Sequence, residues 1–342
     1  MSSILFLAHT EADGGLSKTT REALSGAMTL SRHLQAELTA GLIGEDVSAA
    51  ADSIATSPAT TFLAVQGEDF AKPRYASDAA AAEALCRECA AEIVIAPATS
   101  RFSRVLPGVA HRLGGRADTQ VTGLTAEDGA PAIIRWFYRQ RMLASMTRTQ
   151  RPWVITIAPC CFLPAEDMRG EATLTSLSVE LPDVARRTSV EGIQAPAASE
   201  QTIRPDADLL FVAGAGWTKK QPDGQAHIAE AEQAILAFLD RAKASLGSSK
   251  SLVDLSGEGQ AVLPFMTHLH QVGQTGSTPR HPKGLSTCCH GEEPHVVGWR
   301  FITERRAINL DAGCGWAQGK ADVLYVADAF KVMDKVNELL TG

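Results

Sequence analysis

The chain has 342 residues, of which 45% are hydrophobic and 21% charged, a composition ordinary for globular proteins and long enough for two domains. Its net charge of -7 argues against a nucleic-acid-binding protein, because such proteins normally present a basic face. No stretch approaches the roughly 20 apolar residues of a membrane span. The seven cysteines lack the spacing of a disulfide framework, which predicts a reducing, cytoplasmic location.

Short apolar runs alternate with segments of helical period through the first half of the chain. A strand is predicted at Ile4 to Ala8 and a helix at Ser17 to Leu34, with Ser17 as its N-cap. Further strands are predicted at 38–43, 61–65, 92–96 and 153–158, helices at 79–91 and 102–113, and an antiparallel hairpin at 132–146. The alternation is typical of a parallel sheet with crossover helices, so residues 1–187 are predicted to form one α/β domain.

Residues 188–206 are polar and rich in Pro and Ala, which predicts a linker, and a second α/β domain is predicted over 207–342. Its first strand is Asp208 to Ala213, and the helix that starts at Ile228 has an apolar face running to Leu246, with Gly247 as its stop. A strand at 323–327 and a helix at 330–340 close the chain. The predicted fold class is α/β, with two domains of mainly parallel sheets and a doubly wound second domain.

Two glycines, Gly214 and Gly216, follow the first strand of the second domain and precede its helix. This order is typical of a nucleotide site, because a helix N-terminus presents free N–H groups to phosphate. Two glycines after a buried strand also occur in many ordinary turns, so the motif by itself leaves both interpretations open.

The hexapeptide Gln271-Val-Gly-Gln-Thr-Gly276 is richer in ligand-binding groups. Its glycines bracket an amide and a hydroxyl, so backbone N–H groups, the Thr275 hydroxyl and the amides of Gln271 and Gln274 can converge on one polar ligand. A polar turn between strands accounts for the same residues equally well.

The same hexapeptide resembles the signature of the flavin domain of electron transfer flavoprotein alpha subunits. Three further segments resemble that family: Ile308-Asn309-Leu310-Asp311, Val326-Ala327-Asp328, and Ser249-Lys250, which stands where the family has Ser-Arg. The terminal helix and several N-terminal segments fit more loosely. The resemblance spans the whole chain and is specific in its last hundred residues or so.

Three places depart from the family pattern. The turn at Gly214 to Trp217 lacks the arginine that the family places over the flavin, and Lys250 replaces a second flavin-contacting arginine. In an ungapped alignment the family's phosphate turn falls on His290 to His295, which keeps Gly291 and His295 but adds two glutamates. Negative charge is unfavourable beside a pyrophosphate. A second register, which we favour less, would align Ser286 with the family's serine.

A run of cysteine and histidine lies in the same region, at Cys288, Cys289 and His290, with Cys314 beyond. These residue types bind zinc and iron–sulfur clusters. Adjacent cysteines do not readily chelate one metal together, and no C-x-x-C spacing is present. The favoured interpretation is a buried strand end in which cysteine acts as a small hydrophobe, and no metal site is predicted.

The resemblance implies an electron carrier that binds FAD, pairs with a beta-type subunit, and passes electrons from a partner dehydrogenase to a quinone reductase or another acceptor. It implies that the flavin supplies the chemistry while the protein supplies binding and electrostatics, so that no residue is catalytic. The implied cofactor-binding residues are Gly214, Gly216, Ser249, Lys250, Gln271, Gly273, Gln274, Thr275, Gly276, His290, Gly291, His295, Asn309 and Asp328.

Two alternatives remain open at this point. One is a subunit of a larger oxidoreductase complex with an altered flavin site or an iron–sulfur cluster at Cys288 and Cys289. The other is a non-redox nucleotide-binding or scaffold subunit in which the departures from the family pattern have abolished FAD binding.

Overall fold

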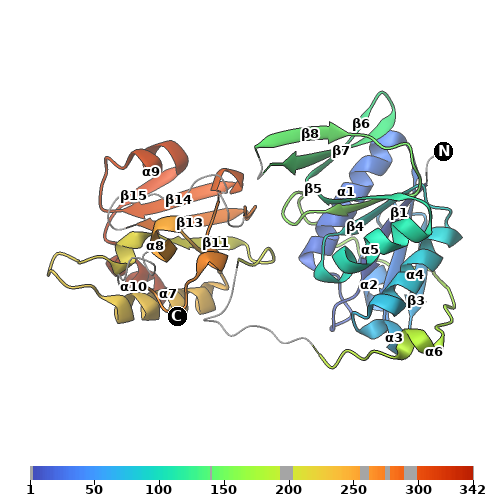
Figure 1. Ribbon diagram of the computed structural model, residues 1–342, viewed down its shortest axis with the longest axis horizontal. Coiled ribbons are helices and arrows are strands. Elements are labelled where there is room, and N and C mark those ends of the chain that lie inside the picture. The colour runs from blue at the N-terminus through green and yellow to red at the C-terminus, as the bar shows by residue number, and fades with distance from the viewer. Residues whose placement is uncertain are drawn as a thin grey trace. The chain divides into compact units, whose positions relative to one another are not determined.

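The computed structural model describes residues 3–138, 141–192, 203–254, 262–273, 278–288 and 299–341. The chain forms two compact units, Met1–Ile193 and Gln194–Gly342 (Figure 1). The large sheet of each unit is wholly parallel and flanked by helices, so the predicted α/β fold class is confirmed. None of the helices in the described ranges combines the length and apolar content that crossing a bilayer requires.

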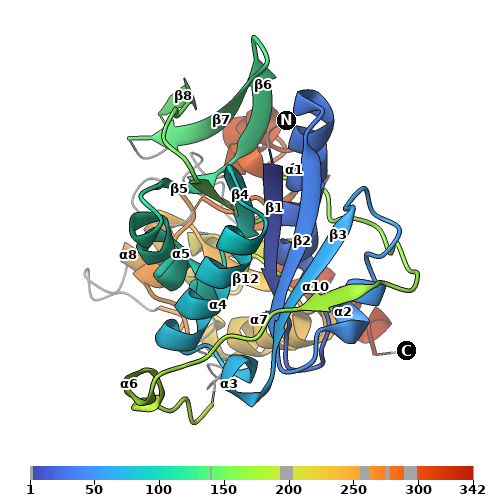
Figure 2. The same ribbon diagram turned by 90° about the vertical axis from the view of Figure 1, so that its right-hand side faces the viewer.

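The N-terminal unit is built on a seven-stranded parallel sheet in the order β10-β3-β2-β1-β4-β9-β5, whose central strands lie side by side in Figure 2. The strands are β1 (Ser3–His9), β2 (Glu37–Gly44), β3 (Thr61–Gln66), β4 (Ile93–Pro97), β5 (Arg116–Val121), β9 (Trp153–Ile157) and β10 (Leu174–Ser176). The helices are α1 (Lys18–Leu34), α2 (Ser48–Asp52), α3 (Glu68–Ala71), α4 (Tyr75–Glu88), α5 (Ser100–Arg112) and α6 (Asp183–Arg186).

Helices cover both faces of this sheet. Successive residues of a strand point to opposite faces, so the central strand β1 contributes to two cores. Phe6 packs on one face with Leu24 of α1, and Leu7 packs on the other with Leu85 of α4 and Val105 of α5. Because both faces of β1 are buried, its sequence is a continuous apolar run with no alternation.

A three-stranded antiparallel sheet, β6 (Gly123–Glu127), β7 (Ala130–Phe137) and β8 (Met142–Met146), extends from the N-terminal unit, and the predicted hairpin is confirmed. The segment that leads from β8 back to β9 is held by Asp118 of β5, a residue that is 3% exposed. The Asp118 carboxylate accepts from Nε of Arg148 at 2.9 Å and from Nε1 of Trp153 at 2.9 Å. The sheet edge and the segment after β8 therefore share one buried carboxylate.

We expect Asp118→Asn to destabilise the N-terminal unit by about 1.5–3 kcal/mol near pH 7, the range for hydrogen bonds to charged groups. Burial raises the pKa of Asp118, but the hydrogen bonds from Arg148 and Trp153 outweigh burial and hold that pKa below its usual value. A lowered native pKa gives stability that is present above the unfolded value and is lost as pH falls through the native one. Denaturant titrations should show the wild-type advantage shrinking below about pH 4. An advantage of constant size would contradict this assignment.

The C-terminal unit has a five-stranded parallel sheet in the order β12-β11-β13-β14-β15. The strands are β11 (Leu209–Ala213), β12 (Ser245–Ser248), β13 (Lys283–Cys288), β14 (Glu304–Asn309) and β15 (Val323–Val326). The helices are α7 (Ile228–Ala242), α8 (Lys250–Asp254), α9 (Gly315–Lys320) and α10 (Ala329–Leu339), with short 3-10 turns η2 (Ala215–Thr218), η4 (His268–His270) and η5 (Trp299–Phe301). Helices α7 and α10 pack on one face of the sheet, and α9 with η5 on the other.

The predicted end of the first helix in this unit is wrong. Helix α7 ends at Ala242 with Lys243 in the left-handed conformation, and Leu246 and Gly247 belong to strand β12. Gly247 is the residue that allows β12 to pack closely, because a Cβ there would lie 2.8 Å from Cγ2 of Val272. The glycine at this position therefore reflects the close packing of β12 against Val272 rather than the end of a helix.

Candidate functional site

The five strands of the C-terminal unit end along one edge of their sheet. Ala213 at the end of β11 is paired with Ser248 of β12 and with Thr287 of β13, and Asn309 ends β14 beside them. The first strand, β11, has neighbours on both sides, so the chain changes direction between β11 and β13. Open α/β sheets bind ligands at the carboxyl edge beside such a reversal.

The turn after β11 carries Gly214 and Gly216. The Gly214 N–H donates to the Thr287 carbonyl at 2.8 Å, and Trp217 donates from Nε1 to Oγ1 of Thr287 at 2.8 Å. Trp217 is fully buried and lies 4.6 Å from Phe330, centroid to centroid. Helix α7 begins only at Ile228, so the two glycines lead into a buried 3-10 turn and do not themselves open that helix.

The turn after β12 carries Ser249 and Lys250. Oγ of buried Ser249 accepts from the Leu252 N–H at 3.2 Å, and this bond closes the first turn of α8. Nζ of Lys250 lies 2.5 Å from Oδ2 of Asp254, whose Oδ1 lies 3.8 Å from Nδ1 of His268. The Lys250 side chain is 42% exposed, so its ammonium stays near solvent at the rim of the carboxyl edge.

Gln271 lies beside the end of β12, where it bridges to Ser248. Its position depends on η4, which is closed by a capping box between Thr267 and His270. Gln271 is 2% exposed, yet among the described residues its Nε2 has no hydrogen-bond partner, and neither has Oγ of fully buried Ser248. Gly273, two residues on, has φ +89°, a left-handed conformation that favours glycine.

Two unsatisfied polar groups at one strand end need an explanation, because a buried donor without a partner costs about 1–3 kcal/mol. An amide that donates and a hydroxyl that donates or accepts match the polar edge of a heterocyclic ligand.

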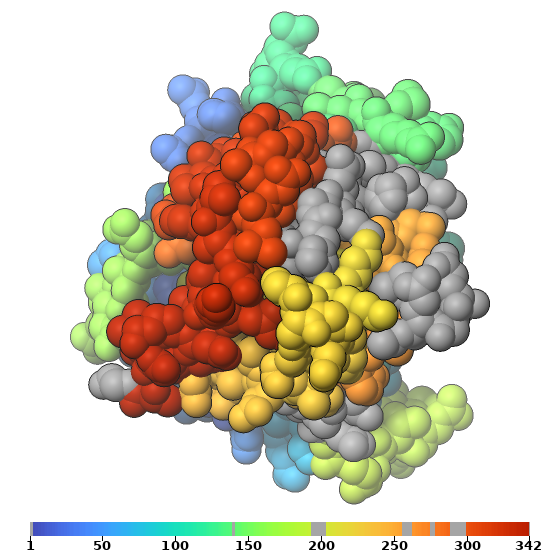
Figure 3. All heavy atoms as spheres, turned by 90° about the vertical axis from the view of Figure 1, so that its left-hand side faces the viewer, coloured from blue at the N-terminus to red at the C-terminus, as the bar shows by residue number. Residues whose placement is uncertain are grey.

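Asn309 and Asp328 complete the carboxyl edge at β14 and β15. Asn309 is 2% exposed, and its Oδ1 accepts from the Asp311 N–H at 2.9 Å. Asp328 caps α10, accepting from the Phe330 N–H at 2.9 Å. Asp328 also lines a cavity of about 680 Å³ between α7 and α10, and Figure 3 shows the side of the unit on which α10 (red) lies.

Several predicted site residues lie outside the described residues: Gln274, Thr275, Gly276, Cys289, His290, Gly291 and His295. The backbone of Cys288 ends strand β13. Cys314 is buried beside Trp299 and Trp316 at the start of α9, in the hydrophobic core. Within the described ranges, no three His, Cys, Asp or Glu side chains are grouped so as to hold a metal ion.

Three residues at this edge are not among the predicted site residues: Ser248, Trp217 and Thr287. The adjacency of Ser248 to Ser249 and Lys250 is the only signal of it in the chain, and its burial depends on the pairing of β12 with β11. Trp217 is a large aromatic residue directly after a Gly-x-Gly turn, a position that suggests the turn is filled by protein.

A family model described as the electron transfer flavoprotein domain matches residues 4–182 of the chain. A search of curated proteins finds no match. The matched range covers the seven-stranded sheet and the antiparallel extension, whereas the motifs at the carboxyl edge lie in the other unit. Because the match spans more than half of the 342 residues, the chain belongs to the electron transfer flavoprotein family.

Proposed function

We propose that this chain is the alpha subunit of a heterodimeric electron transfer flavoprotein and binds FAD at the carboxyl edge of the C-terminal sheet. The observation that carries the proposal is the pair of unpartnered buried groups, Nε2 of Gln271 and Oγ of Ser248, at the end of β12. Gln271 is the first residue of the Gln271 to Gly276 signature and Ser248 is its bridge partner, and a polar heterocycle would satisfy both groups.

The residues at the edge fit a flavin nucleotide in their chemistry. Lys250 brings a half-exposed ammonium paired with Asp254, Gln271 an amide donor and Gly273 a left-handed turn that allows close backbone approach. We assign the remaining contacts to Gly214, Gly216, Ser249, Gln274, Thr275, Gly276, His290, Gly291, His295, Asn309 and Asp328. When bound, the flavin supplies reversible uptake and release of electrons.

The protein's own part is to hold and tune the cofactor. The ammonium of Lys250 favours negative charge nearby, and the buried amide of Gln271 donates a hydrogen bond from a desolvated position. We place the redox partners outside the chain: a beta-type subunit that completes the site, a donor dehydrogenase, and a quinone reductase or another acceptor. We also propose a cytoplasmic location.

The spectrum of the purified protein tests the proposal. The chain should be co-expressed with an electron transfer flavoprotein beta subunit and purified as a complex, and the released cofactor identified by chromatography. Visible flavin absorption with FAD as the released species is the expected result. A colourless complex would overturn the redox function, and stoichiometric iron would point to a cluster-bearing subunit of a larger complex.

We expect Lys250→Met to lower the reduction potential of the bound flavin. A unit charge near a partly exposed site contributes about 1–3 kcal/mol, which corresponds to about 20–60 mV for a two-electron couple. Spectroelectrochemical titration measures the shift, and Lys243→Met is the matched control, because Lys243 is also paired with an aspartate but caps the far end of α7. An equal shift in both variants would contradict the assigned role of Lys250.

A further inference from the structure

A cavity of about 440 Å³ lies in the N-terminal unit, at the carboxyl ends of β1 and β4. These strands are neighbours, and the chain order runs outward from them in opposite directions, to β2 and β3 on one side and to β9 and β5 on the other. The cavity is thus at the reversal point of a doubly wound sheet, where such sheets bind ligands. Its walls come from the starts of α1 and α5, the end of α3 and residues 190–192.

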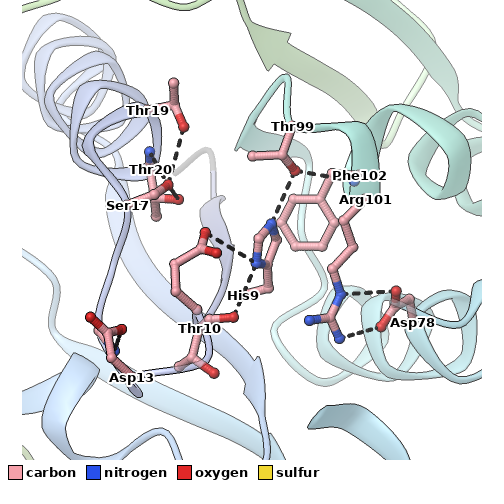
Figure 4. Close-up of polar contacts among 12 residues, drawn as sticks. His9, Thr10, Asp13, Ser17, Thr19, Thr20, Asp78, Thr99, Arg101 and Phe102 are labelled. Atoms are coloured by element: carbon pink, nitrogen blue, oxygen red, sulfur yellow. Dashed lines mark hydrogen bonds and ion pairs between the residues drawn. The ribbon is translucent and has the colours of Figure 1, made fainter. Parts of the chain in front are cut away.

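The floor of the cavity is His9, the last residue of β1, which is 5% exposed (Figure 4). Its Nε2 lies 3.0 Å from Oγ1 of Thr99, and its Nδ1 lies 3.3 Å from the carbonyl of Thr10. Thr99 Oγ1 already accepts from the Phe102 N–H at 3.2 Å, so we assign its hydroxyl proton to Nε2 of His9. In that tautomer Nδ1 carries the hydrogen and donates to Thr10.

The imidazole is therefore uncharged at neutral pH. Burial, with a smaller contribution from the nearby Arg101 guanidinium, lowers the pKa of His9 to about 4. The ring meets Phe102 edge to face at 4.9 Å, which adds an apolar contact below it. A neutral ring with both nitrogens engaged gives the cavity a rigid polar floor.

The cation in the cavity wall, the guanidinium of Arg101, is already paired with a carboxylate. Arg101 donates from Nε to Oδ2 of Asp78 at 3.0 Å and from one terminal nitrogen to Oδ1 at 2.6 Å (Figure 4). Both side chains are buried, so the pair presents no net charge to a ligand. The other charged lining residues, Glu11 and Lys72, are exposed and of opposite sign.

What remains around the cavity is hydroxyl and small apolar surface. The hydroxyl groups belong to Thr10, Ser17, Thr19, Thr99 and Ser100, and the apolar groups are Ala12, Ala71, Pro73 and Val190. Cavities of about 300–1,000 Å³ with an apolar wall and a few fixed polar groups hold compact organic ligands. A phosphate or carboxylate would find no uncompensated buried cation here.

We propose that this cavity binds an uncharged ring compound that carries hydroxyl or amide groups and is about the size of a nucleoside. The site belongs to the N-terminal unit and stands apart from the FAD proposal, because none of its lining residues comes from the C-terminal sheet. The apolar walls enclose the ring, and the threonine and serine hydroxyls bond its polar edge.

Calorimetric titration of the full chain with adenosine tests the site, with adenosine monophosphate and inorganic phosphate as charged comparisons. Two variants fill the cavity from different elements of its wall: Ala71→Trp at the end of α3 and Ser100→Trp at the start of α5. Ala130→Trp is the control, since Ala130 is exposed on β7 and does not line the cavity. Circular dichroism confirms that each variant is folded.

We expect adenosine to bind the wild type and the control equally and to bind either cavity-filling variant at least ten-fold more weakly. Adenosine monophosphate should bind no more tightly than adenosine, and phosphate alone should not compete. Absence of adenosine binding, equal binding by a folded cavity-filling variant, or tighter binding of the monophosphate would each overturn the proposal.

Discussion

The Gln271→Met variant should retain far less flavin than the wild type and, once stripped of flavin, should resist unfolding better. In the flavin-free protein the Nε2 donor of Gln271 is buried with no partner in the part of the chain that the structure describes, and such a donor costs about 1–3 kcal/mol. Methionine has a similar unbranched shape and no donor, so it removes that cost without opening a cavity. If the amide bonds the flavin, the same change removes a desolvated hydrogen bond from the complex.

The two effects have opposite signs, and this makes the experiment decisive. Denaturant midpoints of flavin-free wild type and variant give the first effect, and flavin dissociation constants give the second. Val272→Ala is a useful control, because it opens a cavity beside Gly247 without touching either unpartnered group, and should destabilise the unit with or without flavin. If Gln271→Met lowered flavin-free stability, the amide would have a structural partner and would not be reserved for a ligand.

Much of the N-terminal fold could be predicted from the sequence because its strands are buried on both faces. Such strands are continuous apolar runs, as at Ile4 to Ala8, and the helix that follows carries its own start signal in Ser17, which accepts from the Thr20 N–H. The unpredicted strand β5 has no such run: it is Arg-Ala-Asp-Thr-Gln-Val, and its pairing with β9 depends on the buried Asp118.

The candidate site divides in the same way. Gly214, Ser249, Asn309 and Asp328 lie at or just after strand ends. Strand ends of a parallel sheet meet at one edge, so their proximity could be predicted from the order of elements. The lack of a partner for the Gln271 amide could not be predicted, because it depends on which groups the fold brings around that side chain. The burial of Trp217 in the turn after β11 could not be predicted either, because it depends on the position of Thr287 on another strand.

Evidence for family and evidence for cofactor come from different halves of the chain. The family model matches 4–182, while the signature hexapeptide and the unpartnered groups lie in the C-terminal unit. A chain that kept the matched N-terminal unit and lost the flavin-binding groups of the C-terminal unit would still belong to the family without carrying a flavin. For this reason flavin binding is tested by the spectrum of the complex and by the Gln271→Met variant, and the family match does not test it.

The largest loss of stability in the N-terminal unit is expected from Arg101→Met. Asp78 is fully buried, and Arg101 is its bidentate partner while also donating to the Phe70 carbonyl at 2.7 Å. Removing one member of a buried ion pair leaves an uncompensated charge and costs about 3–5 kcal/mol. Burial already raises the pKa of Asp78 against the opposing effect of Arg101, so without the arginine the carboxyl is protonated more readily.

This gives the variant a characteristic pH dependence. A carboxyl whose native pKa is raised loses stability as pH rises from the unfolded value through the native one, so the Arg101→Met deficit should be smaller at pH 4 than at pH 8. The double variant Arg101→Met, Asp78→Leu should recover most of the loss, because apolar residues can replace a buried pair at little cost. Arg104→Met is the control, since Arg104 is exposed on the same helix, donates to backbone carbonyls of Ser100 and Pro73, and acts on Asp78 only by a smaller charge effect than Arg101 does. Urea denaturation of the wild type and the three variants at both pH values makes the comparison. A double variant no more stable than Arg101→Met would show that the pair's geometry, rather than its charge balance, holds α4 to α5.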